Sequence, residues 1–270
     1  MSPVGRVAGE QARFDAGGRA RAAVRAGRRP MTQPLSRRRP VCIDDQGVWS
    51  ELLRSPRGAA LRPALFLDRD GVIVEEVGHL RRAEDVRLIA GAAAVIAAAN
   101  HAGMPVVVVS NQSGIGRGLF GWEDFAAVQQ RMVEMLEAEG ALIDAAFACP
   151  HHAEAEPPYR HAEHPSRKPN AGMILAAANM LPIVLRTSWI IGDRASDLAA
   201  GRNAGLWGGL LVGPGGRLSE LDTAQGLASA RFRVFVGPSV AAALSVIPSL
   251  RDVRLGSLLD DSKGSAQARP

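Results

Sequence analysis

The chain has 270 residues and a hydrophobic fraction of 47%, which is enough for one sizeable core. Its net charge of +5 comes from residues 1–40, where ten Arg face two acidic residues, so residues 41–270 carry 5 − 8 = −3 and do not indicate a nucleic-acid-binding domain. Two cysteines exclude a disulfide framework, and neither a secretory signal nor an apolar run of about 20 residues is visible, so we expect a cytoplasmic protein.

Residues 1–60 are predicted to be a basic, poorly ordered extension, because they mix Arg, Gly and Pro with little apolar periodicity. A basic arm that contacts RNA or a membrane is the alternative. Within this extension, residues 41–53 have enough apolar content to pack on the domain as a short strand or helix. Residues 61–250 are predicted to form the domain, and 251–270 a polar tail.

Strands and helices alternate along residues 61–250. Short apolar runs predict strands at 64–67, 105–109, 145–149, 188–191, 209–212 and 233–236. Helical spacing and glycine stops predict helices at 92–102, 122–139, 171–180, 195–204 and 239–246. This alternation predicts an α/β fold with a doubly wound, Rossmann-like parallel sheet, whose active site lies at the carboxyl ends of the strands.

Polar residues follow the predicted strands at that edge. Asp68 and Asp70 follow the first strand, Ser110 the second and Asp193 the strand at 188–191, whereas Lys168 precedes a helix. Singly these are weak signals, but together they predict one pocket. Asp68 and Asp193 suit Mg²⁺, and we place Asp70 in the same metal set.

These residue types favour phosphoryl transfer. Asp68 is the candidate nucleophile, and Asp70 the acid that protonates the leaving oxygen and then activates water. Ser110 and Lys168 are placed to hold the phosphoryl group, and Asp197 to orient Lys168 or Asp193. The chain has 30 Arg and only two Lys, so the presence of lysine at 168 indicates that a compact point charge is needed there.

The motifs DRDGV, SNQSG, RKP and GDRASD resemble the four motifs of the haloacid dehalogenase (HAD) phosphatase superfamily. More narrowly, SNQSGIGRG, CPHH and RKPNAGM resemble the group of D-glycero-D-manno-heptose-1,7-bisphosphate 7-phosphatases and histidinol phosphatases. The resemblance implies the roles given above for the catalytic residues. It places substrate contacts at six further positions: Asn111, Gln112, Ser113, Arg117, Arg167 and Arg194.

Members of this group often carry a zinc loop with a Cys-x-His pair and a Cys-x-Cys pair. Here Cys149 and His151 match the first pair, but the second reads His164-Pro165-Ser166. Zinc held by Cys149, His151, His164 and His161 is one reading of this loop, and ordinary polar surface is the other.

The intervals between the motifs are too short for an inserted domain, so we expect a capless enzyme whose site is shaped by loops 75–82, 114–120 and 149–166. The leading function is a Mg²⁺-dependent phosphomonoesterase acting on a phosphorylated sugar, most of all a heptose 1,7-bisphosphate. Histidinol phosphate, a polynucleotide 3′-phosphate and a non-catalytic phosphate-binding module are the alternatives. We expect a monomer without a membrane or nucleic-acid partner.

Overall fold

The computed structural model describes residues 42–56, 58–213 and 218–251, which form an eight-stranded sheet in the order β1-β2-β5-β4-β3-β6-β7-β8. Six neighbouring strands, from β5 to β8, are parallel, as predicted. The strands are β1 Cys42–Ile43, β2 Trp49–Leu52, β3 Leu65–Leu67, β4 Val106–Asn111, β5 Ala145–Cys149, β6 Trp189–Gly192, β7 Gly208–Val212 and β8 Arg233–Gly237.

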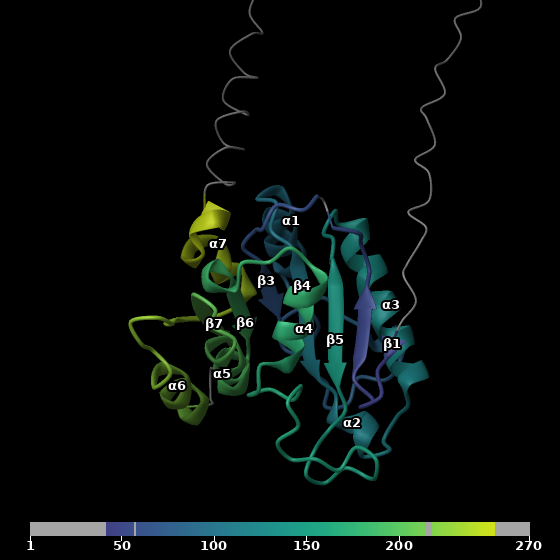
Figure 1. Ribbon diagram of the computed structural model, residues 1–270. Coiled ribbons are helices and arrows are strands. Elements are labelled where there is room, and N and C mark those ends of the chain that lie inside the picture. Colours follow the sequence, from purple (N-terminus) through teal and green to yellow (C-terminus); the bar gives the residue numbers. More distant parts are fainter. Residues whose placement is uncertain (1–41, 57, 214–217, 252–270) are drawn as a thin grey trace, which may run out of the picture. The chain divides into compact units, whose positions relative to one another are not determined.

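Helices cover both faces of the sheet, and for this reason the central strands are apolar up to the polar residues at their carboxyl ends (Figure 1). On one face Leu67 and Val108 pack against α1, α3 and α7, and on the other Phe66 and Val107 pack against α4, α5 and α6. The helices are α1 Ala92–His101, α2 Ser113–Gly116, α3 Trp122–Ala138, α4 Gly172–Met180, α5 Ala195–Asn203, α6 Leu218–Gln225 and α7 Ala243–Val246, with short 3₁₀ turns at η1 Ala83–Asp85, η2 Leu185–Thr187 and η3 Val240–Ala242.

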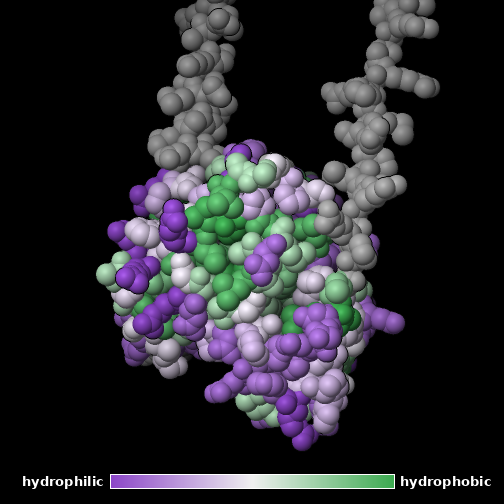
Figure 2. All heavy atoms as spheres, in the orientation of Figure 1, coloured by the Kyte–Doolittle hydropathy of each residue, from purple (hydrophilic) through white to green (hydrophobic). Residues whose placement is uncertain are grey.

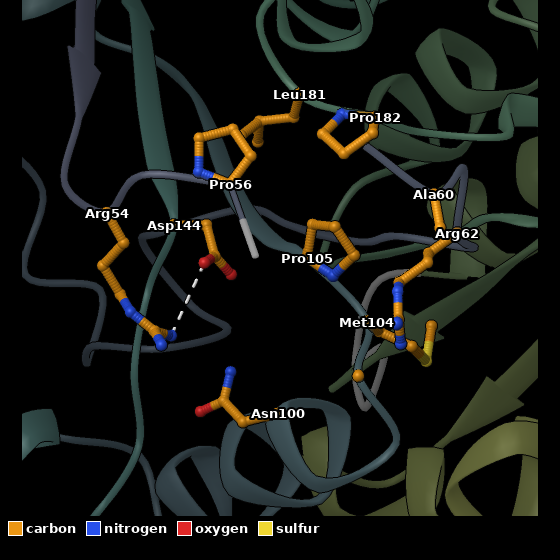
Figure 3. Close-up of a pocket in the computed structure, with 11 residues that line it drawn as sticks. Arg54, Pro56, Ala60, Arg62, Asn100, Met104, Pro105, Asp144, Leu181 and Pro182 are labelled. Atoms are coloured by element: carbon orange, nitrogen blue, oxygen red, sulfur yellow. Dashed lines mark ion pairs between the residues drawn. The ribbon is translucent and has the colours of Figure 1, made fainter. Parts of the chain in front are cut away.

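The sheet differs from the prediction at one edge, where β1 and β2 form an antiparallel pair along β5. Trp49 lies opposite Ala148 and Leu52 opposite Ala145. Just beyond β2, Arg54 forms an ion pair with Asp144 at 3.5 Å, beside a small pocket of about 40 Å³ (Figure 3). The residues of β1 and β2 pack on the domain as strands, one of the two forms expected for residues 41–53, so the domain begins within the predicted extension and its sheet is mixed. Residues 1–41 and residues 252–270 of the predicted polar tail lie outside the described part.

No additional domain interrupts the sheet near the site. The chain between β3 and β4 forms only η1, α1 and loops, so the capless architecture is as predicted. In Figure 2, apolar side chains gather over the face that carries α4, and hydrophilic ones over the loop beyond β5. Among the described residues, no helix has the length and apolar character needed to cross a membrane.

Candidate active site

A cavity of about 710 Å³ opens at the carboxyl ends of β3, β4 and β6. Asp68, Ser110, Lys168 and Asp193 line it together, so the structure brings the predicted catalytic residues to one place. All three loops that were expected to shape the site contribute to its wall. The chemistry of the site depends on the side chains that line this cavity.

Lys168 is the centre of a buried charge network. Its Nζ donates hydrogen bonds to Asp68 Oδ1 at 2.9 Å, to Asp197 Oδ1 at 2.7 Å and to the carbonyl oxygen of Val109 at 2.7 Å. An ammonium group has three N–H donors, so these contacts fix its position. Of the two partners expected for Asp197, Lys168 and Asp193, the contact to Lys168 is present at 2.7 Å. Burial alone would lower the Lys168 pKa, but the carboxylates of Asp197 and Asp68 outweigh it and raise the pKa.

Asp68 is almost completely buried, and burial raises its pKa to about 6. The charge of Lys168 opposes this rise, whereas Asp197 and Asp70 add to it. The contacts from Lys168 Nζ and from the backbone N–H of Arg69 both fall on Oδ1. Oδ2 accepts neither of these hydrogen bonds, and an attacking oxygen must be available in this way.

Two glycines allow the acidic residues to approach one another. Gly71 has φ +77°, and a Cβ there would lie 2.9 Å from Cγ and Oδ2 of Asp193, so the loop after β3 packs against that carboxylate. At the end of β6, a Cβ on Gly192 would clash with the Asp197 side chain. Any larger residue at either position would separate the carboxylates.

Carboxylate oxygens of Asp68, Asp193 and Asp197 lie within 4.8 Å of one another, the one such group of three possible metal ligands among the described residues. Asp197 is engaged otherwise, because Lys168 occupies Oδ1 and the backbone N–H of Arg194 donates to Oδ2 at 3.0 Å. Asp68 and Asp193 supply hard carboxylate oxygens close to one another, which fits Mg²⁺.

Asp70 is held from two sides. Arg69 donates to Oδ1 through Nε at 3.1 Å and through Nη2 at 3.0 Å, and to Oδ2 through Nη2 at 2.9 Å. Gln112 Nε2 donates to Oδ2 at 2.8 Å and to Ser110 Oγ at 2.7 Å. Because both oxygens are engaged, we leave the Asp70 side chain out of the metal set. Gln112, predicted to hold substrate, lines the cavity and also positions Asp70.

The other predicted substrate contacts separate into two groups. Asn111, Ser113, Arg167 and Arg194 line the cavity. Asn111 also exchanges two 3.0 Å hydrogen bonds with the backbone of Lys168, which ties the end of β4 to the lysine. Arg117 is outside the cavity lining and lies 3.8 Å from Glu154. The sequence could not show this, because the turn of α2 decides which side chains face inward.

The loop of residues 149–166 brings Cys149, His151, His161 and His164 together, as predicted. The geometry does not fit one zinc ion. The His151 and His164 rings stack 3.7 Å apart at 2°, whereas Zn²⁺ binds in the plane of a ring at about 2.0–2.1 Å, so one ion cannot lie in both planes. Although His151 Nδ1 is buried without a hydrogen-bond partner, both nitrogens of His164 are engaged, by Ser166 N–H and Gln46 Oε1.

Four titratable residues of the cavity lining had not been named as site residues from the sequence: Arg69, Glu76, His79 and His152. Arg69 lies between the two aspartates of the DRD motif, so its place next to Asp70 was a visible signal. The others lie on loops without a recognisable spacing. A buried carboxylate paired with lysine, a second carboxylate beside it and a held acid at the end of a parallel strand define a hydrolase that transfers phosphoryl groups.

Comparisons with known proteins agree with this class. A family model described as HAD-hydrolase-like matches residues 165–233. A D-glycero-beta-D-manno-heptose-1,7-bisphosphate 7-phosphatase of Mesorhizobium japonicum is 43% identical over 173 residues, which cover 64% of this chain and 80% of that protein.

Two solved structures are also similar. A HAD-like phosphatase of Mesorhizobium loti has a TM-score of 0.70 and 36% identity, covering 79% of this chain and 98% of the other. A D,D-heptose 1,7-bisphosphate phosphatase of B. bronchiseptica, complexed with magnesium and phosphate, has a TM-score of 0.58 and 30% identity, covering 68% and 97%. The chain belongs to the HAD-like phosphatase family.

Proposed function

We propose that the chain is a Mg²⁺-dependent phosphomonoesterase that removes the 7-phosphate of D-glycero-D-manno-heptose 1,7-bisphosphate. The observation that carries the proposal is the contact between buried Asp68 and Lys168, with Asp193 in metal-binding range of the same carboxylate. Similarity to the Mesorhizobium japonicum enzyme supports the substrate and favours the β anomer.

Asp68 and Asp193 would hold Mg²⁺, which supplies positive charge that lets an anionic carboxylate approach an anionic phosphate. Zinc has no part in the proposal, because the paired histidine rings do not fit one ion. Lys168 adds a fixed positive charge at Asp68 and orients it toward the cavity. Ser110 Oγ lies at the cavity wall, in reach of a phosphoryl oxygen.

The reaction has two displacements at phosphorus. Asp68 Oδ2 attacks, the ester P–O bond breaks, and the leaving sugar oxygen takes a proton from Asp70, which gives an aspartyl phosphate and the free alcohol. Water then attacks the phosphorus and passes a proton to Asp70 while the bond to Asp68 breaks. Inorganic phosphate leaves, and both aspartates return to their starting states.

The substrate carries two phosphates, and the cavity wall carries cationic and imidazole groups that suit a second anion. Arg167 and Arg194 lie at the rim with His79 and His152. Arg167 is fixed by a 2.8 Å hydrogen bond from Nη1 to the carbonyl oxygen of His151, so its charge is preorganised. Because the site lacks an inserted cap, a phosphate on the projecting end of a sugar can reach Asp68.

The deciding experiment is a panel of phosphate-release assays with Mg²⁺. Its substrates are the β and α anomers of the heptose 1,7-bisphosphate, histidinol phosphate and a 3′-phosphorylated oligonucleotide. We expect the highest kcat/KM with the β bisphosphate and release of only the 7-phosphate. A higher kcat/KM with histidinol phosphate or the oligonucleotide would replace the substrate, and no release from any of them would favour a phosphate-binding module.

The proposal takes the enzyme as a monomer, because the residues of a single chain suffice to supply the nucleophile, the acid and the metal ligands. It also places the enzyme in the cytoplasm. An exposed, unpaired Cys42 is consistent with that reducing compartment.

A further inference from the structure

Arg69 is an unusual residue for a protein interior. Its side chain is 1% exposed and is the largest of the fully buried side chains in the described part of the chain. A buried guanidinium requires compensating contacts, because its removal from water is costly. Arg69 obtains them from Asp70, through three hydrogen bonds, and from Phe125, whose ring centre lies 5.1 Å from Cζ.

The compensation is incomplete, since Arg69 Nη1 is buried with no hydrogen-bond partner. An apolar side chain of the same length would fill this space without that penalty. Local rules of this kind are broken chiefly at functional sites, where the residue serves chemistry and not stability. Among the described residues, the one carboxylate that the Arg69 side chain contacts is that of Asp70.

The surroundings of Arg69 are rigid. Phe125 packs edge-on against Trp49 at 5.1 Å and against Trp122 at 5.5 Å, and the two tryptophan rings stack 5.5 Å apart. These three aromatic side chains join β2 to α3, and the Phe125 ring contacts the guanidinium. Arg69 Nε and Nη2 face the oxygens of Asp70, and Gln112 approaches Oδ2 separately.

We infer that Arg69 is a positioning residue for this reaction: it fixes the carboxyl plane of Asp70 so that the proton donor faces the leaving oxygen. The inference rests on the role proposed above for Asp70. Misplacement of an acid by about 1 Å can reduce a rate by up to about 100-fold. The effect is confined to the step in which Asp70 gives its proton, and this restriction makes it testable.

The experiment compares kcat/KM for a series of phosphate monoesters whose leaving groups differ in acidity, from 4-nitrophenyl phosphate to an alkyl phosphate. Arg69→Met keeps the length and apolar contact but removes every donor. We expect a loss of roughly 10- to 100-fold with the alkyl ester and of less than about 3-fold with the nitrophenyl ester, which needs no acid. KM should change little in either case.

A double-mutant cycle separates positioning from a merely structural role. Arg69→Met in the Asp70→Asn background should cost less than about 2-fold further, because there is no acid left to position. Equal losses across the leaving-group series, or additive losses in the cycle, would overturn the inference. If Asp70→Asn alone shows no dependence on the leaving group, the proposed role of Asp70 fails instead, and the assignment of Arg69 falls with it.

Two variants guard against loss of folding. Arg69→Lys keeps a cation but cannot donate to both oxygens through a planar fork, so its losses should fall between those of wild type and Arg69→Met. Arg131→Met, at an exposed position of α3 outside the cavity lining, serves as the matched control with unchanged kcat/KM. If Arg69→Lys matched wild type with the alkyl ester, bidentate positioning would be refuted.

Discussion

Lys168 and Asp68 form a buried ion pair, with 2.9 Å between Nζ and Oδ1. The same ammonium contacts Asp197 at 2.7 Å, so one compact charge lies between two carboxylates at the carboxyl ends of the parallel strands. The geometry explains why lysine occupies this position in a chain that otherwise uses arginine almost throughout.

Lys168→Arg should lower kcat by at least about 100-fold, because a planar guanidinium cannot make the same three contacts in the same space. Steady-state phosphate release measures the effect, with Arg186→Lys, an exposed exchange in η2, as control. Wild-type activity in Lys168→Arg would show that only the sign of the charge matters.

Asp68→Asn should reduce phosphate release to below about one-thousandth of wild type, since an amide cannot form the phosphoenzyme. The control is Asp85→Asn, which alters an exposed acid 3.8 Å from Arg82. Trapping of a phosphorylated wild-type protein by acid quench, and its loss in Asp68→Asn, gives a second measurement. An undiminished rate in the variant would refute the covalent mechanism.

Removal of the metal should stop the reaction, and Asp193→Asn should weaken Mg²⁺ binding by roughly 10- to 100-fold. Calorimetric titration of EDTA-treated protein with Mg²⁺ measures the binding directly. Unaltered affinity in Asp193→Asn would remove this residue from the metal site.

The stability of the metal-free protein should fall as the pH rises from about 4 to 6. Burial raises the pKa of Asp68 from its ordinary value of 3.8 to about 6 in the folded chain, so in this window the folded chain keeps a proton that the unfolded chain releases. Asp68→Asn removes this dependence. At pH 7 with EDTA, the free energy of unfolding of Asp68→Asn should exceed that of wild type by about 1–3 kcal/mol, measured by urea unfolding. A pH-independent difference between the two proteins would contradict the shift.

The stacked arrangement of His151 and His164 should depend on their contacts with Gln46, in the loop between β1 and β2, and not on a metal. His151 Nε2 donates to the Gln46 carbonyl oxygen at 2.7 Å and His164 Nε2 to Gln46 Oε1 at 3.1 Å. We expect purified protein without stoichiometric zinc, an EDTA-insensitive Tm at low Mg²⁺, and a loss of about 1 kcal/mol in Gln46→Ala. Gln130→Ala, which removes an exposed contact to Glu134, is the matched control. One zinc per chain, bound tightly, would overturn this reading.

Much of the fold could be predicted because the central strands can be recognised from the local sequence. They are continuous apolar runs that end in polar residues. The predicted strand at 145–149 coincides with β5, and that at 105–109 lies within one residue of the start of β4. The catalytic set was predictable for the same reason, since carboxyl ends of parallel strands meet.

What escaped prediction depends on contacts between distant parts of the chain. The pairing of Trp49 with Ala148 joins segments about a hundred residues apart, and nothing in residues 49–52 names that partner. Arg69 and Asp70 are neighbours in the sequence, but the contact of the guanidinium with the Phe125 ring joins positions more than fifty residues apart. The stacking of His151 on His164 is likewise a property of the folded loop.

The antiparallel pair of β1 and β2 also prevents one edge of the sheet from pairing with strands of other molecules. β5 is a fully apolar strand, and β2 occupies its outer edge. A chain shortened to residues 61–250, the domain predicted from the sequence, would present that edge unpaired, and exposed apolar edges recruit strands from other molecules. Such a fragment would keep every catalytic motif and still be expected to precipitate during purification.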